Sequence, residues 1–68
     1  MNDDRDLYNT KVKDFYEILE KITRLRFEHL KLMCRNPSDE KINKVKKEIL
    51  NLQVQGNLLL MSIMENDA

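Results

Sequence analysis

Hydrophobic residues recur at alternating steps of three and four along two long segments of the chain. This spacing is the a/d repeat of amphipathic helices that pack side by side. The positions expected in the core between the two helices are Val12, Phe15, Leu19, Ile22, Ile42, Val45, Ile49, Leu52, Gly56, Leu59 and Ile63. The pattern predicts an all-α fold, an antiparallel two-helix hairpin that forms one domain over residues 1–68. We expect helices from about Asp4 to Cys34 and from about Pro37 to Glu65, with a turn at 35–37.

The segment between the two repeats contains the only proline of the chain, Pro37. A residue before proline is disfavoured in the helical region, so the first helix is predicted to end by about Arg35. Asn36 is then expected to cap the second helix, with Pro37 at its first position. Asp39 would follow in the first turn, where the helix dipole favours an acid.

Folding the chain back at this turn brings positions of the two repeats opposite each other. Leu19 is predicted to contact Leu52, and Ile22 to contact Ile49. The bulky Phe15 would pack over Gly56, because a large side chain opposite a small one gives close packing. Gly56 is therefore interpreted as a packing position, although glycine costs about 1 kcal/mol inside a helix.

The two helices carry more hydrophobic residues than one interface between them covers. The end of the second helix is hydrophobic on nearly every side, and a second row lies beside the core positions of the first helix. We expect these residues to bind another protein chain, either a different protein or a second copy. The predicted partner-binding residues are Tyr16, Ile18, Leu25, Leu58, Leu60, Met61 and Met64.

Positive and negative charges balance over the whole chain but are unevenly placed. Lys and Arg number 12, as do Asp and Glu, so the formal net charge is zero. Residues 24–47 hold eight bases and three acids, whereas residues 48–68 hold three acids and no base. Acids are interleaved with the bases, so a solvated face is favoured over nucleic-acid binding, and we expect no nucleic-acid partner.

Candidate chemistry is sparse. The chain has one His and one Cys, no glycine-rich loop and no metal-ligand spacing, so we expect no enzyme activity, cofactor or metal. The unpaired Cys34 favours a reducing compartment. The longest hydrophobic run, Leu58 to Met61, is far shorter than the ~20 residues that cross a bilayer, and the acidic start differs from a secretory signal. A cytoplasmic protein without membrane insertion is expected.

Arg26 and His29 occupy core positions of the first repeat. One interpretation is that they are buried and fix the register or the partner. The other is that they lie near the turn with their polar ends in water. The sequence leaves both open.

The C-terminal segment, Val54 to Asp67, reads VQGNLLLMSIMEND. It resembles the end of the small E-type co-chaperones of bacterial type III secretion (the YscE, PscE and EscE group). These proteins are of similar length, have a small residue before an aliphatic run and end in acids. The turn here differs from the glycine-containing turn of that group. The resemblance implies a co-chaperone that, with a tetratricopeptide-repeat (TPR) chaperone, keeps the needle subunit soluble before export.

Two alternatives remain from the same pattern. The Pro-Ser-Asp turn is similar to that of type III needle subunits, although those have a longer polar N-terminal arm. The hairpin is also suited to self-association as a four-helix-bundle dimer within a larger assembly.

Overall fold

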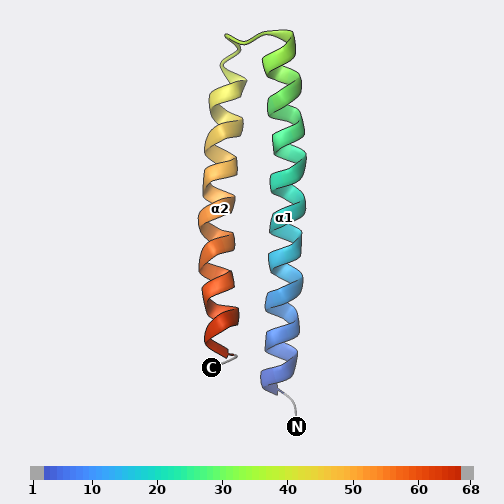
Figure 1. Ribbon diagram of the computed structural model, residues 1–68, viewed down its shortest axis with the longest axis vertical. Coiled ribbons are helices and arrows are strands. Elements are labelled where there is room, and N and C mark those ends of the chain that lie inside the picture. Colours follow the sequence, from blue (N-terminus) through green and yellow to red (C-terminus); the bar gives the residue numbers. More distant parts are fainter. Residues whose placement is uncertain (1–2, 67–68) are drawn as a thin grey trace.

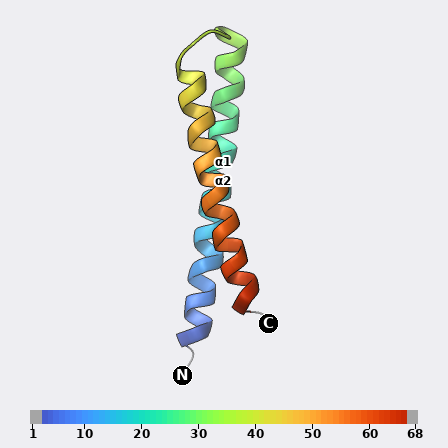
Figure 2. The same cartoon turned by 90° about the vertical axis from the view of Figure 1, so that its left-hand side faces the viewer.

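The protein is a hairpin of two long helices, α1 (Asp3–Arg35) and α2 (Lys41–Asn66), which run antiparallel (Figure 1). The computed structural model describes residues 3–66, with side chains from 5 to 65. No strand occurs within this range, so the predicted all-α hairpin is confirmed. Viewed from the side of α2, the two helices cross near their middle (Figure 2). A shallow crossing of this kind is what heptad-like packing produces.

The connection between the helices is longer than predicted. The helix α1 ends within one residue of the expected position, but α2 begins at Lys41 and not at Pro37. The backbone N–H of Asn36 still donates to the carbonyl of Leu32 at 2.8 Å, so Asn36 completes α1. A turn over residues 36–39 then separates Asn36 from Lys41, so the prediction that Asn36 caps α2 was wrong.

The turn has its own hydrogen bonds. The N–H of Asp39 donates to the carbonyl of Asn36 at 3.0 Å, which closes a β-turn with Pro37 in its second position. The Oδ1 of Asn36 accepts a hydrogen bond from the Ser38 hydroxyl at 3.0 Å. The Oδ1 of Asp39 accepts one from the N–H of Lys41 at 2.9 Å. Asp39 therefore caps α2, the role that the sequence assigned to Asn36.

The core between the helices is small. Four hydrophobic side chains are only 5–7% exposed: Ile22, Ile42, Val45 and Ile63. Gly56 is also buried, and the predicted core residues Val12, Phe15, Ile49, Leu52 and Leu59 are half-buried. Leu19 departs from the prediction, since 40% of it is exposed. Two helices enclose only the residues directly between them, so neighbouring positions stay partly in water.

The packing around Gly56 sets the register of the helices. A Cβ on Gly56 would lie 3.4 Å from Cγ2 of Ile18 and 3.8 Å from Cε1 of Phe15. The predicted proximity of Phe15 and Gly56 is therefore present, but Ile18 approaches more closely. Further toward the open end, the Nζ of Lys11 donates a hydrogen bond to the Oγ of Ser62 at 2.6 Å.

The hairpin is elongated. Its extents are 54 × 14 × 13 Å and its radius of gyration is 15.7 Å, against about 11 Å for a compact chain of this length. Its accessible surface is 5826 Å², whereas a compact monomer of this size exposes about 4,500 Å². Each chain thus exposes about 1,300 Å² more than a compact fold would.

Candidate protein-interaction surface

A row of hydrophobic side chains follows the side of α2 that faces away from α1. Val54, Leu58 and Met61 are spaced by four and three residues, so they share one face of the helix. Each is about 60% exposed, with 58% for Val54, 62% for Leu58 and 59% for Met61. Leu and Met favour helix formation, which keeps this row in a regular arrangement. We refer to these three residues as the C-terminal row.

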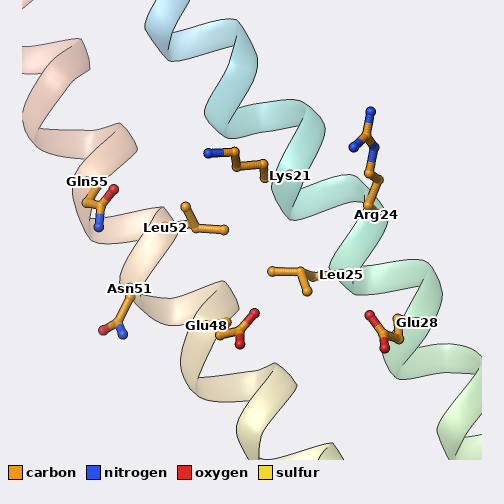
Figure 3. A pocket seen from close by; sticks show the side chains of 8 residues that line it. All are labelled: Lys21, Arg24, Leu25, Glu28, Glu48, Asn51, Leu52 and Gln55. Carbon is orange, nitrogen blue, oxygen red and sulfur yellow. The ribbon is translucent and has the colours of Figure 1, made fainter.

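The two flanks of the hairpin differ in chemistry. On one flank lies an open groove of about 510 Å³ at the helix interface, with Leu25 of α1 and Leu52 of α2 pointing toward each other in its centre (Figure 3). Polar side chains surround this pair: Lys21, Arg24, Glu28, Glu48, Asn51 and Gln55. Six of the eight lining residues are polar or charged, so this flank is the more polar of the two.

The other flank is more hydrophobic. Across the helix interface, a shallow hollow is lined by Arg26 and His29 of α1 and by Lys46, Ile49 and Leu50 of α2. A second hollow on α1 joins the same Arg26 to Leu30. Arg26 thus connects the exposed Leu30 of α1 and the exposed Leu50 of α2 on one side of the hairpin.

Helical periodicity extends this flank along the whole hairpin. Leu19 and Tyr16 precede Leu30 by 11 and 14 residues, close to whole numbers of turns. Met64 follows Leu50 by 14 residues, and Leu60 follows Ile49, which lines the first hollow, by 11. We call the following exposed residues the apolar face: Tyr16, Leu19, Leu30, Leu50, Leu60 and Met64.

The predicted partner-binding residues divide into two groups. Tyr16, Leu58, Leu60, Met61 and Met64 are exposed, as a docking surface requires. The other two lie elsewhere: Ile18 packs beside Gly56, and Leu25 lies against the groove with Leu52. Both are half-buried. They belong to the helix interface because the register brings their row, and not that of Leu19, toward α2.

Sequence reasoning did not include Leu50 and Val54 among the surface residues, although both are exposed. Their place on one face of the helix could be predicted from the sequence. Leu50, Val54, Leu58 and Met61 follow steps of four, four and three, a second helical row next to the core positions.

Arg26 and His29 have different surroundings. Arg26 is exposed, in agreement with the interpretation that its charge lies in water. His29 is half-buried, and its Nε2 is a buried nitrogen with no hydrogen-bond partner among the described residues. A buried polar atom without a partner costs about 1–3 kcal/mol.

Other kinds of site find little support in residues 3–66. Within that range, no three His, Cys, Asp or Glu side chains come together as metal ligands would. Neither described helix contains a segment long and hydrophobic enough to cross a membrane. Cys34 is exposed and has no disulfide.

Comparison with known proteins identifies no relative: no protein-family model, curated protein or solved structure matches this chain. The class that the fold defines is therefore the all-α helical hairpin, with an exposed hydrophobic surface as its candidate site.

Proposed function

We propose that this protein is a helical protein-interaction subunit and not an enzyme, and that it acts as a co-chaperone of type III secretion. In that role it would bind a TPR chaperone and help to keep the needle subunit soluble in the cytoplasm before export. The observation that supports the proposal is the exposed C-terminal row, Val54, Leu58 and Met61, in the segment that resembles the E-type co-chaperones.

The energetics favour coverage of this row by another chain. Burying one Leu or Met side chain is worth about 1.5–3 kcal/mol. Met is flexible and adapts its shape to a partner surface. A helix that presents hydrophobic residues at steps of three and four also fits the hydrophobic groove of a helical-repeat protein.

Co-expression tests the proposal. The chain would be produced together with the TPR chaperone and the needle subunit of the secretion system from the same organism, and complexes would be separated by size-exclusion chromatography with mass measurement. We expect the three chains to elute together. The double variant Leu58→Asp, Met61→Asp should elute apart from the chaperone, because charge on this row opposes burial.

A matched control places two acids on the polar flank of the same helix, as Asn51→Asp, Gln55→Asp. Both positions are exposed, so this variant should still form the complex. A wild-type chain that elutes apart from both partners would contradict the co-chaperone role. A complex that survives the Leu58 and Met61 changes would contradict the proposed binding row.

A further inference from the structure

The apolar face and the C-terminal row are distinct surfaces that adjoin along α2, where Leu50 of the face continues the helical row of Val54, Leu58 and Met61. The row points away from α1, whereas the apolar face extends across both helices along one flank. A partner seated on the row leaves most of the apolar face in water. The apolar face therefore requires a second binding partner to cover it.

We propose that this occupant is a second copy of the chain, which packs antiparallel on the apolar face to form a four-helix bundle. This inference deepens the proposed function, since it rests on the same role as an interaction subunit and assigns a second partner surface. In the dimer, the bend of one copy lies beside the open end of the other.

The flank that carries the apolar face is large enough for a stable dimer interface. The hairpin is 54 Å long, and two packed helices are about 20 Å wide, so the flank has a footprint of about 1,000 Å². A standard interface buries about 800 Å² on each partner. The footprint is thus large enough for a standard interface. Its burial would remove much of the surface that the elongated monomer exposes beyond a compact fold.

Charge complementarity determines which arrangement of the two copies is favoured. Residues 24–47, which include the bend, hold eight bases and three acids. Residues 3–23 and 48–66, which form the open half, hold four bases and eight acids. Each hairpin is therefore positive at the bend and negative at the open end, although its net charge is zero.

Two copies related by a two-fold axis along the hairpin would place like charges together. A two-fold axis across the hairpin places the positive half of each copy beside the negative half of the other. At the level of whole halves the two copies are therefore self-complementary in charge, and attraction between opposite charges selects the orientation of association.

The first test measures the mass of the purified chain across a dilution series. We expect a dimer that dissociates on dilution. Leu30→Asp should weaken self-association roughly a hundredfold or more, because the symmetric interface loses each leucine twice. Leu7→Asp is the matched control, since Leu7 is also an exposed leucine of α1 but is displaced from Leu30 around the helix. It should leave the dimer intact.

The second test measures the orientation without any variant. A nitroxide label on the native, exposed Cys34 would report the distance between the two copies by electron–electron double resonance. Cys34 lies near the bend, so the antiparallel dimer separates the labels by roughly 45 Å, given about 1.5 Å of rise per residue. A parallel dimer would bring them within about 20 Å.

The outcomes separate this inference from the proposed function. A monomeric wild type, a short label distance, or a dimer that is sensitive to Leu7→Asp and insensitive to Leu30→Asp would overturn the antiparallel dimer. None of these results concerns the C-terminal row, whose test uses the Leu58 and Met61 variant with the chaperone. Circular dichroism shows whether the Leu30→Asp variant keeps its helices. If the variant loses them, the label distance on the native chain, which needs no variant, still tests the antiparallel dimer.

Discussion

Cγ2 of Ile18 lies 3.4 Å from the position that a Cβ on Gly56 would take, the closest side-chain approach to this glycine from α1. Phe15 is the next neighbour, at 3.8 Å. Both distances are ordinary van der Waals contacts for one added carbon. The space next to Gly56 therefore accommodates a methyl group but no larger side chain.

Gly56→Ala should stabilise the protein by up to about 1 kcal/mol, because alanine removes the conformational cost of glycine in a helix and its Cβ fits the available space. Gly56→Leu should destabilise it by about 1–3 kcal/mol, because its additional carbons collide with Ile18 and Phe15. Urea denaturation at one fixed protein concentration measures both changes. A stabilising Gly56→Leu would show that the register of the helices differs from the one described.

Asp39→Ala should destabilise the protein by about 1 kcal/mol, because it removes the side-chain acceptor for the N–H of Lys41 at the start of α2. Asp39→Asn keeps an acceptor and should cost much less. Thermal denaturation followed by circular dichroism measures the difference. If Asn36 capped α2, as the sequence suggested, Asn36→Ala would cost more than Asp39→Ala; we expect the reverse.

His29→Leu should stabilise the hairpin by about 1 kcal/mol, since it replaces a buried nitrogen that has no hydrogen-bond partner with hydrocarbon. His29→Gln keeps a polar group at the same place and should give no such gain. Because His29 lies beside the apolar face, the measurement belongs in a Leu30→Asp background, where self-association does not add to stability. A loss of stability in His29→Leu would indicate that the imidazole has a favourable contact in solution.

The sequence was sufficient to predict the hairpin, because few other folds are compatible with two heptad-like repeats separated by a single proline. It also identified the buried residues Ile22, Ile42, Val45 and Ile63. It did not predict which row of α1 faces α2 near Gly56. A straight helix drifts by about 20° per heptad relative to a strict seven-residue repeat, so a row that begins in the interface leaves it after a few turns. Ile18 and Leu25 thus replace Leu19.

The start of α2 was misplaced for a related reason. Asn36, Ser38 and Asp39 all have side chains that cap helices, and the sequence does not rank them. In the structure Asn36 follows the last residue of α1 and opens the β-turn, and Asp39 is the residue whose side chain caps α2. The candidate surface was partly predictable, since five of the seven expected partner-binding residues are exposed. The division into two surfaces required the arrangement of both helices.

The double variant Leu60→Asp, Met64→Asp should abolish association of every kind. Both residues are exposed on the apolar face at the end of α2, adjacent to the C-terminal row, so two new charges there oppose both the second copy and the chaperone. The neighbouring core residue Ile63 is buried against α1 and remains unchanged, so the helices of the monomer should persist in part. Mass measurement across dilution and co-elution with the chaperone test the two interactions separately. Asn51→Asp, Gln55→Asp serves again as the control with equal added charge on the polar flank. A variant that still dimerises and still binds the chaperone would remove the physical basis of both proposals, because the hydrophobic end of α2 would then have no part in either interface.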